Sequence, residues 1–177
     1  VALPSAGPGI ASGTVLTFAR AMGEYGATSM LAGNIPGKTG TVSQKIAMVI
    51  DADNTQISKI EAVIREISKH GRIVVKRAYG NWKKDTLKNW EGEIKRLAIK
   101  AEQQFDYVSG KNATDMALVI DTIELLYANI YDAFVIVSSD SDYTPLAIKL
   151  HESGVYVMGV GERKTPEAFR NACDEFI

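Results

Sequence analysis

Two short apolar runs of this 177-residue chain each end in a pair of aspartates. The first pair is Asp51 with Asp53, and the second is Asp140 with Asp142. An apolar run this short, bounded by a polar turn and followed by a helical pattern, is typical of a buried strand in a parallel sheet. Ligands bind beyond the carboxyl ends of such strands, which share one edge. We therefore expect the two acidic pairs to lie close together.

A third segment brings another carboxylate to this edge. Asp115 opens a predicted helix directly after the loop that leaves the third predicted strand. Carboxylates this close repel one another, so each needs a raised pKa or a cation. An aspartate here could instead cap a helix, an alternative that applies to Asp115 and Asp142. Clusters of oxygen ligands usually hold Mg²⁺ or Mn²⁺, and the predicted metal ligands and catalytic residues are Asp51, Asp115, Asp140 and Asp142.

Three more residues receive supporting roles: Asp53, Asn54 and Asp121. The amide of Asn54 could accept from a cation or a water and donate to a phosphate, or it could simply stabilise the turn. Asp121 lies six residues after Asp115, hence about 9 Å farther along the helix and on another face. We expect Asp121 to orient a lysine or backbone groups behind the site.

The elements that position these residues alternate regularly from Lys45 onwards. Strands are predicted at residues 45–50, 72–79, 104–108, 134–138 and 155–160, and helices at 57–69, 86–101, 114–129, 143–152 and from Pro166. Such alternation predicts a three-layer α/β/α domain with a mainly parallel, five-stranded sheet.

Basic and aromatic side chains crowd the end of the second predicted strand and the loop beyond it. Basic groups neutralise phosphates and aromatic rings stack on unpaired bases, so this region is a candidate path for a single-stranded nucleic acid. Trp82, in a turn between charges, is the best stacking candidate, although about half of the set could be an ordinary solvated helix face. The residues predicted to bind this nucleic acid, which the resemblance described below implies is RNA, are Lys76, Arg77, Tyr79, Trp82, Lys83 and Lys84, with Lys88 beside them and Lys111 and Arg163 near the acidic edge.

The composition excludes several other classes. The net charge of −1 gives no global polycation, and the single cysteine, Cys173, allows neither an intramolecular disulfide framework nor a cysteine-based zinc site. A lone cysteine fits a reducing compartment, so we expect a cytoplasmic protein. The chain shows neither a Gly-x-Ser-x-Gly elbow nor a Walker-type phosphate loop.

Residues 1–44 differ in composition and form a separate appended segment rich in Gly, Ala, Ser, Thr and Pro. Its apolar stretch at residues 9–31 is interrupted by Arg20 and Glu24. A membrane helix needs about 20 apolar residues with few or no charges, so no membrane insertion is expected. We expect this tail to be loosely attached to the domain at residues 45–177.

Residues 45–177 resemble the NYN family, the LabA-like branch of the PIN-like nucleases. The matching motifs are VIDADN at residues 49–54, KNATDMAL at 111–118 with Asp121, and VSSDSDY at 137–143. The resemblance implies a PIN-like sheet with strand order 3-2-1-4-5 and metal-dependent cleavage of RNA. It places Asp51, Asp115, Asp140 and Asp142 at the acidic positions of the family, with Asn54 beside them.

Residues 1–42 resemble a fragment of a molybdate-type ABC transporter permease, carried by motifs such as FARAMGEYGAT at 18–28 and AGNIPGKT at 32–39. The other membrane helices of a permease are absent, so transport is the weakest of three functional interpretations. The first is an Mg²⁺- or Mn²⁺-dependent ribonuclease that hydrolyses phosphodiester bonds of single-stranded RNA. The second is a non-catalytic module that binds RNA or protein. A homo-oligomer is left open.

Overall fold

A computed structural model describes residues 44–105 and 112–177 of the chain. The chain divides between residues 42 and 43, and the description below concerns the second unit. The expectations for the tail at residues 1–43 and for Lys111 therefore lie outside the described residues.

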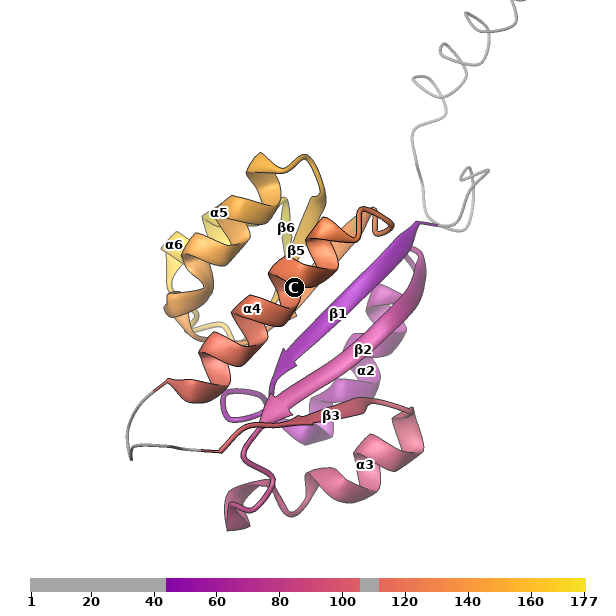
Figure 1. Cartoon of the computed structure of the whole chain (residues 1–177), viewed down its shortest axis with the longest axis vertical. Coiled ribbons are helices and arrows are strands. Elements are labelled where there is room, and N and C mark those ends of the chain that lie inside the picture. Colours follow the sequence, from indigo (N-terminus) through magenta and orange to yellow (C-terminus); the bar gives the residue numbers. More distant parts are fainter. Residues whose placement is uncertain (1–43, 106–111) are drawn as a thin grey trace, which may run out of the picture. The chain divides into compact units, whose positions relative to one another are not determined.

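The described part contains one sheet of six parallel strands in the order β3-β2-β1-β4-β5-β6 (Figure 1). The first five strands have the order 3-2-1-4-5, which confirms the arrangement implied by the resemblance. The strands are β1 (Lys45–Asp51), β2 (Arg72–Gly80), β3 (Lys100–Gln103), β4 (Ala133–Val137), β5 (Tyr156–Val160) and β6 (Glu175–Phe176).

Helices cover both faces of this sheet, which confirms the three-layer architecture (Figure 1). One layer holds α2 (Ile60–Ile67) and α3 (Trp90–Leu97), and the other holds α4 (Ala113–Tyr127), α5 (Thr144–Glu152) and α6 (Glu167–Ala172). Three short 3₁₀ turns precede helices: η1 (Ile57–Lys59), η2 (Asp85–Leu87) and η3 (Ser141–Tyr143).

The central position of β1 in the sheet explains why its sequence is a continuous apolar run. Side chains alternate between the two faces of a strand, and both faces of β1 are covered. Met48 and Ile50 pack in the core beneath α2 and α3, while Ala47 and Val49 pack beneath α4 and α5. The buried run then stops at Asp51, whose carboxylate therefore lies at the carboxyl edge of the sheet.

Two strand predictions need correction. The third strand lies at residues 100–103, because α3 ends at Leu97 and Ala98 turns the chain with a left-handed φ of 50°. Gln104 and Phe105 are not in a strand, and the rest of the predicted 104–108 segment lies outside the described residues. The sixth strand, β6, was not predicted because two residues are too few to show an alternating pattern.

The described residues include no helix that is both long enough and apolar enough to cross a membrane.

Candidate functional site

Asp51 lies at the end of β1 and is fully buried, with 0% of its surface exposed. Its Oδ1 accepts hydrogen bonds from the backbone N–H groups of Asp53 (3.1 Å) and Asn54 (3.3 Å). Its Oδ2 accepts from Asn54 Nδ2 and Ser138 Oγ, both at 2.8 Å. A carboxylate offers about four lone-pair sites, so these donors fill them. Direct binding of a cation by Asp51 therefore requires one donor to move.

Burial raises the pKa of Asp51, and the nearby charge of Asp115 adds to that effect. The hydrogen bonds from Asn54 and Ser138 act in the opposite direction, because they stabilise the charged form. The same two side chains thus hold the carboxylate in place and oppose its neutralisation.

The second acidic pair is organised by Ser138, which is itself buried directly after β4. Ser138 Oγ accepts from the backbone N–H of Asp140 at 3.0 Å. Asp140 then caps η3, because its Oδ1 accepts from the backbone N–H of Asp142 at 2.9 Å. The capping alternative considered for Asp142 therefore applies to Asp140. Asn112 Nδ2 lies 3.4 Å from Asp142 Oδ2 and links this pair to the start of α4.

Asp115 reaches the same edge from the first turn of α4. Its Oδ1 accepts from the hydroxyl of Tyr143 at 2.8 Å. Burial raises the pKa of Asp115, and the charges of Asp140, Asp142 and Asp53 raise it further. Aspartates from the end of β1, the start of α4 and the turn after β4 therefore lie at this edge.

The aspartates at this edge differ in the charge of their partners. Asp53 lies 3.6 Å from Lys84 Nζ, and both carboxylate oxygens of Asp121 lie 2.6 Å from Arg77 Nη1. The remaining aspartates take the hydrogen bonds described above from neutral donors. These are the four residues predicted as metal ligands: Asp51, Asp115, Asp140 and Asp142. Among the partners that the structure describes, the charge of these four is therefore less compensated than that of Asp53 and Asp121.

Among residues 44–105 and 112–177, no three carboxylate, imidazole or thiolate groups converge into a metal cage. Mg²⁺ does not require such a cage, because it usually keeps several waters and binds one or two carboxylates together with substrate phosphates. The donor set consists of oxygens whose described hydrogen-bond donors are neutral, and it fits an ion of this kind.

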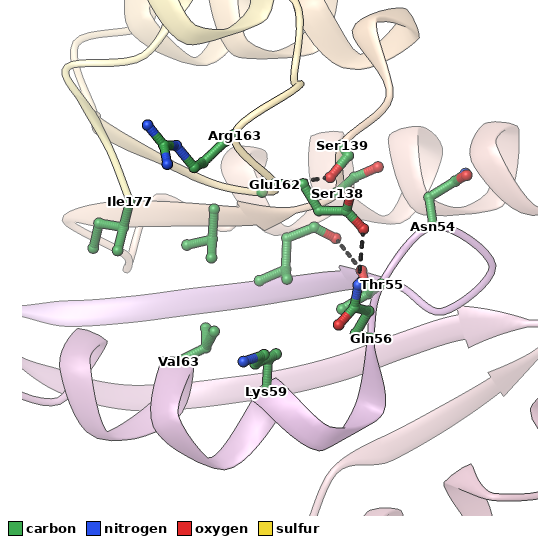
Figure 2. A pocket seen from close by; sticks show the side chains of 13 residues that line it. Asn54, Thr55, Gln56, Lys59, Val63, Ser138, Ser139, Glu162, Arg163 and Ile177 are labelled. Atoms are coloured by element: carbon green, nitrogen blue, oxygen red, sulfur yellow. Dashed lines mark hydrogen bonds between the residues drawn. The ribbon is translucent and has the colours of Figure 1, made fainter.

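Two adjacent cavities open at the carboxyl edge. The acidic cavity, of about 450 Å³, is lined by Asp53, Asp140 and Ser141 among others. The second cavity, of about 480 Å³, is called here the apolar cavity and is shown in Figure 2. Its lining includes Val63, Val137, Val160 and Ile177, with Asn54 and Gln56 as polar neighbours.

Three predicted RNA-binding residues have internal partners instead. Tyr79 is 1% exposed, and its hydroxyl donates to Asp121, so its ring cannot stack on a base. Arg77 forms an ion pair with Asp121, which raises the pKa of the guanidinium. Lys76 Nζ donates to the carbonyl oxygen of Leu97 at 2.5 Å and so caps the end of α3. The sequence missed these roles because each partner lies more than 20 positions away.

Trp82 is also more tightly held than a free stacking residue. Its indole N–H donates to the carbonyl oxygen of Glu102 at 3.0 Å, and its ring lies 5.9 Å from that of Trp90. Trp82 therefore anchors the loop after β2 to β3, and its role in stacking on a base stays a prediction.

The structure leaves basic groups near the acidic edge. Lys83 is exposed, with its ammonium 5.0 Å from the ring centre of Phe105, and Lys84 lies beside Asp53. Arg163 lines the apolar cavity. Asp121, predicted to orient a lysine or backbone behind the site, binds Arg77 and Tyr79 there. Ser138, Asn112 and Tyr143 were not predicted as site residues, although all three lie within or beside the quoted motifs.

Comparison with protein families matches residues 45–177 to the NYN domain. The chain belongs to the NYN domain family. NYN domains are PIN-like nucleases, so the match supports a nuclease-type or RNA-related role, and nucleases of this kind generally use divalent metals.

A solved structure supports the fold of this NYN domain. It is a protein of unknown function from Vibrio parahaemolyticus, with a TM-score of 0.63 and 18% sequence identity. The match covers 78% of this chain and 94% of that protein. At this identity the likeness concerns the fold alone.

The curated relatives that match this chain are a different kind of protein, namely transport permeases. A putative molybdenum transport permease of Bacillus subtilis is 43% identical over 58 residues, which is 33% of this chain and 26% of that protein. The ModB molybdenum permease of Escherichia coli K12 is 48% identical over 50 residues, covering 28% of this chain and 22% of that protein. The chain thus spans about a quarter of these permeases, which confirms the partial resemblance.

Proposed function

We propose that this NYN domain is a metal-dependent ribonuclease that hydrolyses phosphodiester bonds of single-stranded RNA. One observation carries the proposal most strongly. Four aspartates from three separate segments meet at one edge of the sheet, and the hydrogen bonds they receive come from neutral donors. Such an arrangement costs free energy unless a cation balances it, because like charges close together oppose ionisation. Proteins keep such a cost where it serves a function.

In this proposal Mg²⁺ or Mn²⁺ binds at the carboxyl edge to one or two of Asp115, Asp140 and Asp142 together with waters, and Asp51 joins them when a donor moves. A divalent cation at this position would neutralise a phosphodiester oxygen and lower the pKa of a water. Tyr143 positions Asp115, and Ser138 positions Asp51 and Asp140. Asp53 and Asn54 shape the turn around Asp51, while Asp121 stays behind the site with Arg77.

The proposed RNA path is narrower than the sequence indicated. Lys83, Lys84 and Arg163 remain as the described cations that could neutralise phosphates, with Lys88 exposed beside them. Lys111 stays in the proposal as a sequence-based candidate. Arg77, Tyr79 and Lys76 are left out because their polar groups hold internal partners.

The test is cleavage of an end-labelled single-stranded RNA in Mn²⁺, in Mg²⁺ and in a chelator. We expect cleavage with metal only, and a loss of about 100-fold or more for Asp115→Asn or Asp51→Asn, because each removes charge that acts on the reacting phosphate. Glu152→Gln is the matched control, since it neutralises an exposed carboxylate at the end of α5. Equal cleavage by wild type and both aspartate variants would overturn the proposal.

The second candidate is an RNA-binding module without catalysis. It is favoured by the saturation of Asp51, whose four lone-pair sites are filled in the described state. It predicts metal-independent RNA binding with no product at any metal concentration, which the same experiment measures.

A further inference from the structure

The apolar cavity lies beside the aspartates but presents a different chemistry. Figure 2 shows Val63 on one wall and Ser138 and Ser139 on the other, with Asn54 at one end and Ile177 towards the opposite end. Its volume of about 480 Å³ falls within the range of roughly 300–1,000 Å³ typical of small-molecule sites. It can therefore receive a group much larger than a water or an ion.

Two residues connect this cavity directly to the acidic cluster. Asn54 and Ser138 both line the apolar cavity and both donate to Asp51 Oδ2. A group held there lies one side chain away from the carboxylate at the end of β1. The apolar cavity is thus a neighbour of the reacting position.

The acidic and apolar cavities share a wall of polar side chains. Gln56 Nε2 donates to Glu162 Oε1 at 3.1 Å, and both residues line both cavities (Figure 2). Thr55 supports the same wall through a 3.2 Å hydrogen bond from its hydroxyl to the carbonyl oxygen of Val137. One ligand could therefore extend from one cavity into the other along this wall.

The lining can hold a heterocycle with polar edges. Valines and Ile177 supply apolar walls, and the side-chain amides of Asn54 and Gln56 offer both donors and acceptors. Charged side chains of both signs also lie in this lining: Lys59 and Arg163 are cations, and Glu162 stays charged because its hydrogen bond with Lys164 lowers the pKa of this carboxyl. A flat base with polar edges satisfies both parts of this lining.

We propose that the apolar cavity receives one unpaired nucleobase of the RNA, the base that flanks the phosphate at the aspartates. This inference rests on the proposed ribonuclease function and adds to it a base-binding subsite. A base can enter only when it is unstacked and unpaired, so the subsite would exclude duplex RNA from productive binding. The cavity then sets which nucleotide is tolerated beside the cut.

The first experiment uses the wild-type full chain and an RNA with a single mapped cut. An abasic nucleotide is placed at each position in turn near that cut. We expect one adjacent position at which the rate falls by roughly tenfold, because the RNA loses apolar burial and hydrogen bonds in the cavity. Equal rates at every abasic position would overturn the proposal.

A pair of variants then assigns that position to the cavity. Val63→Phe fills the cavity, whereas Val74→Phe makes the same change on an exposed residue of β2 that is not among the lining residues. We expect Val63→Phe to cut intact RNA as slowly as wild type cuts RNA that is abasic at the sensitive position. The cleavage rate of Val63→Phe should be the same on intact RNA and on that abasic RNA. If Val63→Phe and Val74→Phe show the same abasic profile as wild type, the base lies elsewhere and the proposal fails. The wild-type scan stands by itself if Val63→Phe does not fold.

Binding separates this inference from the ribonuclease proposal. In the Asp115→Asn background, dissociation constants for intact and abasic RNA are measured without turnover. Weaker binding of the abasic RNA that disappears on adding Val63→Phe supports the subsite, even if wild type proves unable to cut. Normal metal-dependent cleavage with no base-dependent binding would overturn the subsite and leave the ribonuclease standing.

Discussion

Ser138 Oγ donates to Asp51 Oδ2 at 2.8 Å, joining the carboxyl ends of β4 and β1 across 87 positions of the chain. The same hydroxyl oxygen accepts from the backbone N–H of Asp140 at 3.0 Å. One buried serine thus positions an aspartate of each acidic pair. This hydroxyl therefore links the two acidic pairs at the edge of the sheet.

Ser138→Ala should therefore destabilise the protein. Hydrogen bonds to charged groups contribute about 1.5–3 kcal/mol, and the alanine leaves a buried carboxylate with one donor fewer. We expect a loss of that size in the free energy of unfolding, measured by urea denaturation. Ser153→Ala removes an exposed hydroxyl that donates to the carbonyl of Lys149, and should cost no more than about 0.5 kcal/mol. Equal losses in the two variants would contradict this role.

The raised pKa values of Asp51 and Asp115 predict how stability depends on pH. The folded protein keeps these protons to a higher pH than the unfolded chain, whose carboxyl groups titrate near 3.8. Their contribution to stability is complete below that value and is lost as the pH rises through the raised pKa values. Above that window both groups are charged, and their burial opposes folding.

Asp115→Asn tests this sign. The free energy of unfolding of the variant, relative to wild type, should increase as the pH rises from about 4 to 7, by up to about 1 kcal/mol because the site is partly exposed. Urea denaturation over a pH series measures the difference, with Glu152→Gln expected to parallel wild type. A difference that shrinks with rising pH would show that Asp115 is stabilised as the charged form.

Divalent metal should stabilise the folded protein. An ion that binds only the folded state at 100 times its Kd adds about 2.7 kcal/mol. We expect Mg²⁺ or Mn²⁺ to raise the melting temperature of wild type, a chelator to reverse the rise, and Asp140→Asn to abolish most of it. A rise of the same size in Asp140→Asn would place the ion elsewhere.

Substitution of Arg77 should lower stability, whereas substitution of Lys83 should lower RNA affinity. Arg77→Gln breaks the ion pair with Asp121, whose side chains are 23% and 22% exposed, and should cost about 1–3 kcal/mol of stability. The RNA affinity of this variant, measured by fluorescence anisotropy under conditions in which it is folded, should stay close to that of wild type. A large loss of affinity without a loss of stability would return Arg77 to the RNA path.

Lys83→Gln should show the opposite pattern. This side chain is exposed, so the free energy of unfolding should change by less than about 0.5 kcal/mol. RNA binding should weaken, and the slope of log affinity against log salt should fall by about 1, the change expected when one phosphate contact is removed. An unchanged salt slope would exclude Lys83 from contact with phosphate.

Ala98 offers a backbone prediction. Its left-handed φ of 50° is unfavourable for a residue with a Cβ atom, so Ala98→Gly should stabilise the protein by about 0.5–1 kcal/mol. Ala128→Gly is the matched control, because Ala128 ends α4 with a right-handed φ of −63° and glycine there adds only unfolded-state entropy. Urea denaturation should give opposite signs for the two variants.

Ala98 also marks the limit of what the sequence predicts about the fold. Glycine normally signals a left-handed turn after a helix, so Leu97-Ala98-Ile99 gave no sign that α3 had ended. The strand that follows is an edge strand with charged Lys100 and Glu102, which hides the apolar alternation of a strand. By contrast, β1 and β4 are buried on both faces, and their apolar runs predicted them closely.

The sequence predicted which aspartates gather at the candidate site better than it predicted which side chains pair with one another there. Asp51, Asp115 and Asp140 follow from the rule that parallel strands share a carboxyl edge. The partnership of Arg77 with Asp121 does not, since a mid-strand arginine looks the same in sequence whether it faces a phosphate or a carboxylate 44 positions away. Pairings of this kind depend on the register between elements, which a single sequence does not display.

The all-parallel sheet also has a consequence for the order of folding. β1 lies at the centre of the sheet, yet its partner β4 comes much later, with Ile46 paired to Ala133. Pairings between distant segments form slowly, because the entropy of closing a long loop is lost before the new contacts stabilise the chain. The carboxyl edge around Asp51 is therefore complete only after β4 has paired with β1. A partly folded chain would hold its central aspartate without the serine that positions it.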